Sequence, residues 1–259
     1  MALEALSPVN ITSQGSGNEL PSPLHQFEIH KWLDLSLSGY DISFTNASAF
    51  MMGGVLLTLF LFQVSIRHGR LIPSRGQAAG EMVYEFVAHM LKDSAGKEAS
   101  RYFPFVFSIF LFILSANLLG MIPYSYTVTS QIIVTFSLAM LVFTLVTFIG
   151  FIRHKSRFLT YFVPQGVPKI LLPLIIPIEL ISYLSRPISL SVRLFANMMA
   201  GHTMMKVFAG FTMIMGIWGV APLALNIGLT VFEILVAFLQ AYVFTILTCL
   251  YLHDAIHLH

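Results

Sequence analysis

Four long runs without a single Asp, Glu, Lys or Arg dominate this sequence and limit what the chain can fold into. They cover residues 42–66, 102–152, 207–232 and 234–253. About 20 consecutive apolar residues let a helix cross a bilayer core, and the second run is long enough for two such helices. Only 10% of the residues are charged and 56% are hydrophobic, whereas soluble domains carry roughly a quarter charged residues. The sequence therefore predicts an all-α integral membrane protein.

The remaining composition excludes several other classes of protein. The lone Cys249 lies inside one of the apolar runs, so the chain has no disulfide framework and no cysteine-based metal site. The net charge of +2 is small and the basic residues follow the ends of the runs, which argues against nucleic-acid binding. Residues 1–23 lack the pattern of a cleaved signal peptide and predict a loose tail. We expect an N-terminal extramembrane segment over residues 1–45 and a single membrane domain over residues 46–259.

Breaks in the apolar pattern divide the membrane domain into five predicted spans. The first ends at the basic stretch RHGRLIPSR, the second at Pro123 and the third at RHKSR, and the uncharged turn YSYTVTS separates the second from the third. The predicted spans are residues 46–66, 103–123, 131–152, 170–217 and 222–253.

Between the first two spans, residues 78–95 have the pattern of an amphipathic helix. Its charged side chains include Glu81, Glu85 and Lys92, and the segment is too short and too charged to span a bilayer, so we expect it to lie on the membrane surface. Six apolar side chains fall on one helical stripe: Met82, Val83, Phe86, Val87, Met90 and Leu91.

The basic residues predict how the chain is oriented. They cluster after the first span, before the second span at Lys97 and Arg101, and after the third span, while the turn between the second and third spans has none. The positive-inside rule then places these loops on the cytoplasmic or matrix side. The N-terminus is predicted outside and the histidine-rich C-terminus inside.

The last third of the chain departs from simple spans. Prolines at positions 168, 173, 177 and 187 predict a bent or broken helix at its start. Residues 188–216 would be about 43 Å long as a helix and residues 222–253 about 48 Å. Both lengths exceed a hydrocarbon core of about 30 Å, which favours a strongly tilted hairpin of two long helices.

Ionisable side chains stand inside this apolar third at Glu179, Arg193, His202 and Glu233. A charged group at the centre of a membrane helix costs about 3 kcal/mol or more, so each one needs a partner or water. Arg193 and Asn197 are neighbours at i and i+4, whereas His202 lies on the opposite side of the same helix. Glu233 and Gln240 are seven residues apart and share one face.

The same spacing puts Glu179, Arg186 and Arg193 on one face if the helix continues through Pro187. Arg186 and Lys206 are interpreted as side chains that snorkel to an interface.

Structural interpretations remain open beside the functional ones. Arg193 and Glu233 could form an ion pair, and Asn117 in the second span could hydrogen-bond between helices. The terminal histidines have spacings compatible with a metal site, although tail histidines are more often solvated: His253, His257 and His259. A haem protein would need axial histidines within the spans, and only His202 lies deep in one. Inverted repeats and paired broken helices would favour a self-contained proton-coupled transporter, and neither is evident.

The motif SLSVRLFANMMAGH, with ELISYLSRPIS before it and FEILVAFLQAYVFTILTCLYL after it, resembles subunit a of the rotary F-type ATP synthase. The stretch NLLGMIPYSY extends the resemblance, which covers roughly residues 25–255. It implies a stationary subunit with two offset half-channels for protons, in a bacterial inner membrane or a mitochondrial inner membrane. The implied partners are the c-subunit ring, the peripheral-stalk b subunits and, indirectly, the F1 sector. No cofactor or metal is implied, and no phosphate-binding G-x-x-x-x-G-K-[ST] motif is present.

The resemblance also implies roles for individual residues. Arg193 matches the essential arginine that faces the c-ring, and Asn197 and Gln240 match its polar neighbours. His202 and Glu233 match the pair that lines the outer half-channel, with Asn117 as a contributor, and Glu179 matches the acidic residue of the inner half-channel. In many bacterial members the positions of His202 and Glu233 hold an acid and a histidine, so the order here is reversed.

Overall fold

The computed structural model describes residues 43–66, 73–122, 125–155 and 171–257, together with residue 27 and the short stretches 31–33, 36–37 and 40–41. Several of the expectations above concern residues outside these ranges. One is the loose tail over residues 1–23, and the others involve Arg67, Arg70, Pro123, Arg157, Pro168 and His259.

Six α-helices make up most of the described chain. They are α1 (Asn46–Ile66), α2 (Arg75–Ala95), α3 (Phe103–Gly120), α4 (Ile132–His154), α5 (Leu172–Ile214) and α6 (Val220–Ile256). Within the described residues, the five helices other than α2 are long and apolar enough to cross a membrane. The predicted class is confirmed: the chain is an all-α integral membrane protein.

Short strands precede α1, and the sequence did not predict them. β1 (Lys31–Leu33) pairs antiparallel with β4 (Phe44–Thr45), and β2 (Ser36–Leu37) pairs antiparallel with β3 (Tyr40–Asp41). Helix α1 begins directly after β4 because two side chains cap its first turn. Ser48 Oγ accepts a hydrogen bond from the Thr45 amide at 2.9 Å, and the Ser48 amide donates to Thr45 Oγ1 at 3.4 Å.

Helix α2 begins earlier than the predicted residue 78 because Ser74 caps it, its hydroxyl accepting from the Gln77 amide at 3.4 Å. The helix ends where Gly96 adopts a positive φ of 78°. Val87, Met90 and Leu91 are buried, and α2 packs against α1, α3 and α6. Met82, the first member of the predicted stripe, is 71% exposed.

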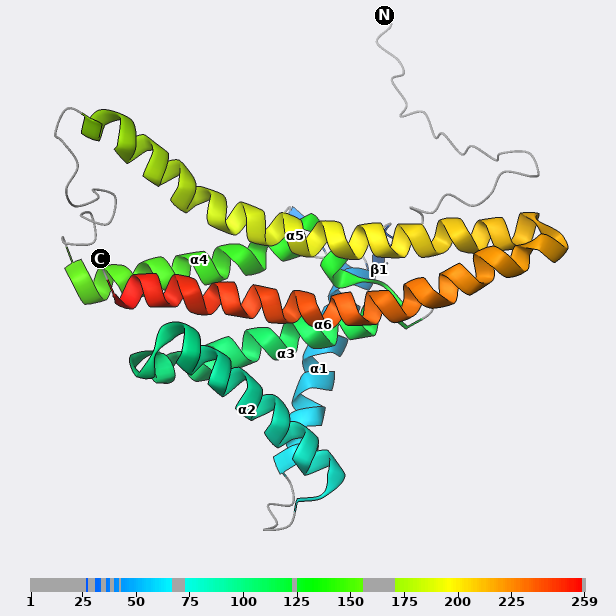
Figure 1. Cartoon of the computed structure of the whole chain (residues 1–259), viewed down its shortest axis with the longest axis horizontal. Helices are drawn as coiled ribbons and strands as arrows, with labels where there is room; N and C mark the ends of the chain where they lie inside the picture. Colours follow the sequence, from blue (N-terminus) through cyan, green and yellow to red (C-terminus); the bar gives the residue numbers. More distant parts are fainter. Residues whose placement is uncertain are drawn as a thin grey trace, which may run out of the picture.

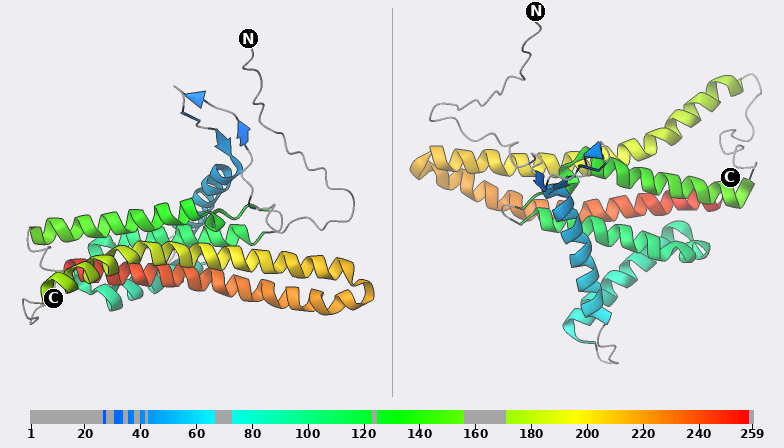
Figure 2. Two further views of the ribbon diagram at one scale, coloured as in Figure 1. Left: turned by 90° about the horizontal axis from the view of Figure 1, so that it is seen from above. Right: turned by 180° about the vertical axis from the view of Figure 1, so that it is seen from behind.

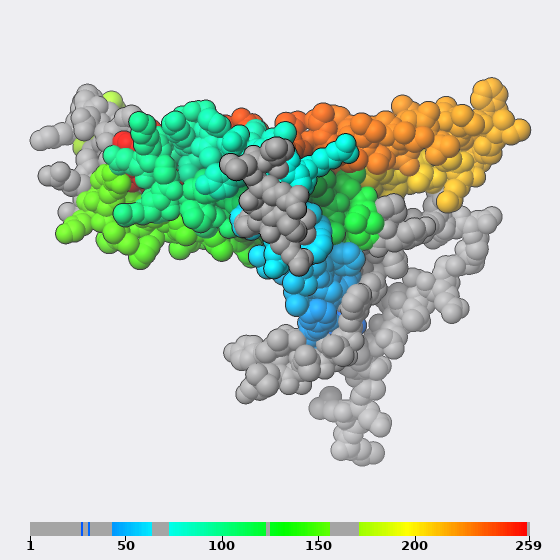
Figure 3. Space-filling model, turned by 90° about the horizontal axis from the view of Figure 1, so that it is seen from below, coloured from blue at the N-terminus to red at the C-terminus, as the bar shows by residue number. Residues whose placement is uncertain are grey.

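Helices α5 and α6 form a long antiparallel hairpin (Figure 1); α4 packs against both of its helices, and α3 packs against α6. The views from above and behind show that the hairpin extends past the ends of α3 and α4 (Figure 2). Helix α1 runs at a steep angle to α3, α4 and the hairpin and projects from the elongated body that they form (Figure 3). If α1 lies along the bilayer normal, the hairpin is strongly tilted, as its excess length requires.

The hairpin turn, η6 (Gly216–Gly219), depends on two glycines. Gly216 has a φ of +54°, and a Cβ on Gly219 would lie 2.4 Å from the Thr212 carbonyl oxygen. The core lies away from this turn, among the middle of α5, the second half of α6, α3 and α4. Its fully buried side chains include Phe110, Leu194 and Phe244. The turn end of the hairpin therefore stands clear of the packed core.

Candidate functional site

Helix α5 carries most of the ionisable residues that the sequence singled out. It runs without interruption from Leu172 to Ile214, although Pro177 and Pro187 lie inside it. Figure 1 shows that the first part of α5 bends away from the hairpin. The prolines therefore bend the helix and do not break it, which satisfies the condition that Glu179, Arg186 and Arg193 share one face.

His202 and Glu233 meet between α5 and α6. The distance from His202 Nε2 to Glu233 Oε1 is 3.5 Å, and both side chains are buried. Within the described part of the chain, neither carboxylate oxygen of Glu233 has a hydrogen-bond partner beyond this contact. An imidazole and a carboxyl group exchange a proton at about 2.6–3.2 Å or through one water, so this pair needs only a small approach to do so. The structure thus brings together the two residues that the sequence had matched to one pair.

Gly201, which has no side chain, makes room for the carboxyl group of Glu233. A Cβ on Gly201 would lie 2.5 Å from Glu233 Oε1 and 2.8 Å from its Cδ. Real Cβ contacts do not come this close, so the carboxyl group packs directly on the backbone of α5. Gly201 precedes His202, yet sequence reasoning gave it no role because the contact lies between two helices.

Thr127, in the connection between α3 and α4, also contacts His202, and sequence reasoning missed it. The distance from Thr127 Oγ1 to His202 Nε2 is 3.1 Å, and both side chains are buried. The segment YSYTVTS had been interpreted only as an uncharged turn. Its unusual content of hydroxyl groups was the one available signal.

Arg193 and Asn197 lie on the opposite, exposed side of α5. Asn197 Nδ2 donates to Oε1 of the buried Gln240 at 2.9 Å, which links this face to α6. Arg193 forms no hydrogen bond or ion pair with any residue that the structure describes. The open alternative of an ion pair between Arg193 and Glu233 is therefore not realised, because Glu233 faces His202 instead.

Asn117 bridges α3 and α6 deep in the core. Its side chain is fully buried, and Nδ2 donates to the Ala237 carbonyl oxygen at 3.2 Å. Ala237 lies between Glu233 and Gln240 along α6, so the asparagine is held at the level of the two predicted polar positions. The interhelical hydrogen bond that the sequence left open is present.

Arg186 has a specific partner at the far end of the hairpin, which differs from the snorkelling interpretation. Its Nη1 lies 3.0 Å from Asp254 Oδ2, and its guanidinium lies over the rings of Tyr183 and Tyr251 at 5.5 and 5.1 Å. Asp254 follows the last apolar run, where the sequence alone suggested no partner. Glu179 is half-buried and, among the described residues, forms no ion pair.

Lys206 lies one turn beyond His202 and is half-buried. Its ammonium is 6.0 Å from the centre of the Phe27 ring, which in turn contacts the edge of the His202 ring at 6.5 Å between centroids. The Phe27 carbonyl accepts a hydrogen bond from Gln131 Nε2 at 3.0 Å. Phe27 therefore covers part of the His202 side of α5.

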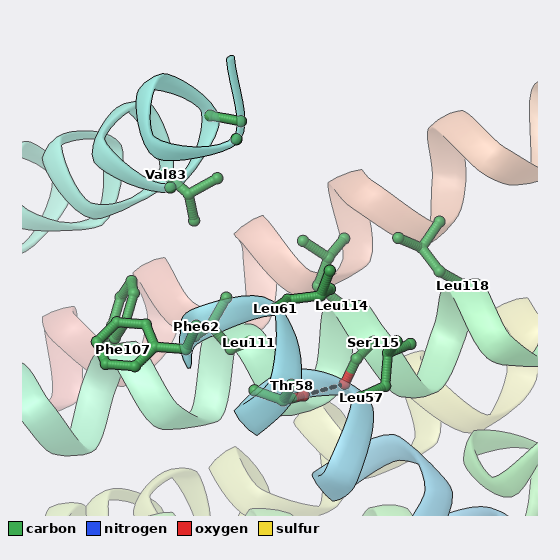
Figure 4. A pocket seen from close by; sticks show the side chains of 13 residues that line it. Leu57, Thr58, Leu61, Phe62, Val83, Phe107, Leu111, Leu114, Ser115 and Leu118 are labelled. Carbon is green, nitrogen blue, oxygen red and sulfur yellow. Dashed lines mark hydrogen bonds between the residues drawn. The ribbon is translucent and has the colours of Figure 1, made fainter. Parts of the chain in front are cut away.

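Two other features lie apart from this group of residues. The rings of His253 and His257 are 4.7 Å apart, but the described ranges contain no cluster of three potential metal ligands. A cavity of about 320 Å³ lies between α1, α2 and α3 (Figure 4). Its lining is apolar apart from Thr58 and Ser115, whose hydroxyls hydrogen-bond to each other at 2.7 Å. It contains none of the predicted site residues.

Comparisons with known proteins identify the family of the chain. The family model described as "ATP synthase A chain" matches residues 47–253. Proteins named "ATP synthase subunit a" from Brucella ovis, Brucella canis and Brucella suis are each 56% identical to the chain over 243 residues. Each alignment covers 91% of this chain and 97% of the relative. On the strength of both matches, the chain belongs to the ATP synthase A chain family.

Proposed function

We propose that the chain is the stationary proton-conducting subunit of the membrane sector of an ATP synthase. It provides two offset half-channels, and Arg193 separates them at the surface that meets the c-subunit ring. Proton flow through the half-channels is coupled to rotation of the ring. The observation that carries this proposal is the contrast on α5 between an exposed arginine and a buried, paired His202.

Arg193 supplies a positive charge that cannot be removed by deprotonation. At about 4 Å and an effective dielectric near 20, such a charge stabilises a passing carboxylate by about 4 kcal/mol. This energy corresponds to about three pKa units, so a protonated ring carboxyl that reaches Arg193 releases its proton. The same charge repels protons that would otherwise leak directly between the half-channels. The hydrogen bond from Asn197 to Gln240 supports the arginine-bearing face against α6.

His202 and Glu233 form the proton-exchanging pair of the outer half-channel, and Asn117 lies beside it through its bond to Ala237. Glu179 belongs to the inner half-channel, near the bent start of α5. The basic loops face the cytoplasm or matrix under the positive-inside rule, which puts the hairpin turn on the outer side. Protons therefore enter near the turn and leave toward the start of α5.

Replacement of Arg193 by alanine tests the proposal in membrane vesicles that contain the assembled complex. We expect ATP-driven proton pumping to disappear while the complex still assembles, because the ring carboxyl no longer meets a fixed charge. Arg101→Ala, which removes an exposed charge from the segment before α3, is the matched control and should pump normally. Normal pumping by Arg193→Ala would overturn the proposal.

Purification provides a second, independent test. A subunit that faces a c-ring should co-purify in mild detergent with a ring of small proteolipid subunits and with the peripheral-stalk b subunits. Isolation of the chain alone under conditions that preserve other membrane complexes would contradict the proposed assembly.

A further inference from the structure

We infer that Thr127 is a positioning residue of the proposed outer half-channel, and that its hydroxyl holds the His202 ring when Nε2 carries no proton and Glu233 is ionised. The inference rests on the proposed function and adds a third residue, from the α3–α4 connection, to the pair on α5 and α6. It starts from the two contacts that converge on a single ring nitrogen.

Nε2 of His202 lies 3.1 Å from Thr127 Oγ1 and 3.5 Å from Glu233 Oε1. A ring nitrogen holds at most one proton, so it donates when protonated and accepts when it is not. A hydroxyl can do both, whereas an ionised carboxylate can only accept. Thr127 is therefore the one of these two neighbours that can donate to a bare Nε2 while Glu233 is ionised.

This difference defines two states of the pair. In the first, His202 is an imidazolium and Nε2 can pass its proton to Glu233 Oε1, which breaks the N–H bond, forms an O–H bond and leaves a neutral ring with its proton on Nδ1. In the second, Glu233 has passed the proton on to a carboxylate of the c-ring and is ionised again, and the Thr127 hydroxyl turns to donate to the bare Nε2. The hydroxyl rotates but keeps its own proton. The imidazole thus stays hydrogen-bonded in both states, and a buried nitrogen is never left unsatisfied, which would cost about 1–3 kcal/mol.

The connection between α3 and α4 is built to hold Thr127 in this place. A Cβ on Gly120 would lie 2.7 Å from Thr127 Cγ2, so the absence of a side chain there admits the threonine. Ser125 Oγ donates to the Leu119 carbonyl at 2.6 Å, and Ser130 Oγ donates to the Thr127 carbonyl at 2.6 Å. These bonds tie the connection to the end of α3 and to η3 (Val128–Ser130).

The group that donates to the bare Nε2 of His202 is neutral, and the charged groups near the ring lie on α5 and α6. Glu233 faces it from α6, Lys206 lies one turn further along α5, and the Phe27 ring meets it edge-on. The described residues of the α3–α4 connection, 121–122 and 125–131, carry no charged side chain. A hydroxyl in this position can follow the proton state of the ring without adding another charge.

Three variants in the complete ATP synthase separate the hydroxyl from the packing of the side chain. Thr127→Val keeps the shape and removes the hydroxyl, while Thr127→Ser keeps the hydroxyl and removes the methyl group that packs on Gly120. Thr129→Val is the matched control. Its hydroxyl is also buried in the connection but has no hydrogen-bond partner among the described residues.

We expect Thr127→Val to lower the initial rate of ATP-driven proton pumping by about tenfold, the cost of leaving a buried nitrogen unpaired. Thr127→Ser should stay within about twofold of the parent, and Thr129→Val should match the parent. A merely structural role predicts the reverse order, with the serine variant impaired and the valine variant active. That result, or equal pumping by Thr127→Val and Thr129→Val, would overturn the inference.

Arg193→Ala, measured in parallel, distinguishes the two proposals. If Arg193→Ala pumps normally, the proposed function fails. If Arg193→Ala is inactive while Thr127→Val pumps like the control, the proposed function stands and only the role of Thr127 is lost.

Discussion

The two sides of α5 hold their polar groups in opposite ways. His202 is buried and faces both Glu233 and Thr127, so its partners come from the same chain. Arg193 is exposed and pairs with none of the described residues. In a membrane, an exposed charge is costly unless something else meets it. The difference fits the proposed function, in which His202 is served by groups of its own subunit and Arg193 faces a second subunit.

The comparison also explains why the buried side has so little space. A buried charge is tolerated when a partner lies close and hydrogen bonds satisfy the remaining atoms. Gly201 admits the Glu233 carboxyl group, and Gly120 admits Thr127, so two missing side chains let the three groups converge. No comparable confinement surrounds Arg193 among the described residues, and in the proposed function this side chain meets a group that moves past it.

Glu233→Gln, which disrupts the buried pair with His202, should have the largest effect on pumping. Glutamine keeps the shape but cannot take up or release a proton, so ATP-driven pumping should fall by at least about 100-fold, in line with the loss of a positioned acid or base. Pumping is measured by dye quenching in vesicles. Glu85→Gln, an exposed carboxyl on α2, is the control. Full activity of Glu233→Gln would mean that the buried pair does not carry protons.

Gly201→Ala should have an intermediate effect. The new Cβ would lie 2.5 Å from Glu233 Oε1 and must displace the carboxyl group from His202. We expect pumping to fall by about tenfold, because misplacement of a reacting group by about 1 Å can cost up to about 100-fold.

Gly228→Ala is the matched control for this change. It lies in the other helix of the hairpin, and its Cβ would have no atom within 4 Å. The control should leave pumping unchanged, and the helix should gain about 0.5–1 kcal/mol in stability. Equal pumping by the two alanine variants would show that the carboxyl group has more room than the structure indicates.

Arg186→Ala should have the smallest effect. It should lower the stability of the complex more than its pumping activity. It removes the ion pair with Asp254 and the contacts with two tyrosine rings at the end of the hairpin away from the turn. The side chains of Arg186 and Asp254 remain 25% and 35% exposed, so solvent screens the pair and its loss should cost about 1 kcal/mol. Thermal denaturation of the purified complex measures this cost.

A double-mutant cycle with Asp254→Ala isolates the pairwise contribution. If Arg186→Ala lowers stability by the same amount with and without Asp254, the ion pair contributes nothing to stability and the ring contacts account for the loss.

Much of the candidate site followed from spacing along the helices. The seven-residue interval from Glu233 to Gln240 placed both on one face of α6, where both are buried, and His202 was correctly predicted on the side of α5 away from Arg193. Helical periodicity decides such relations because it is a property of one element. Thr127 and Asp254 could not be found in this way, since each acts across elements far apart in the chain. The strands before α1 were missed as well, because each is only two or three residues long.

The sequence by itself determined that the chain spans a membrane, where its long helices lie and which faces of those helices carry polar groups, since these follow from hydropathy and helical period. The tertiary structure alone decided which polar groups meet. Glu233 contacts His202 and not Arg193, Thr127 contacts the same ring nitrogen, and Arg186 pairs with Asp254. The physical reason is that interhelical contacts depend on how the helices pack, including the close approach that Gly201 and Gly120 allow.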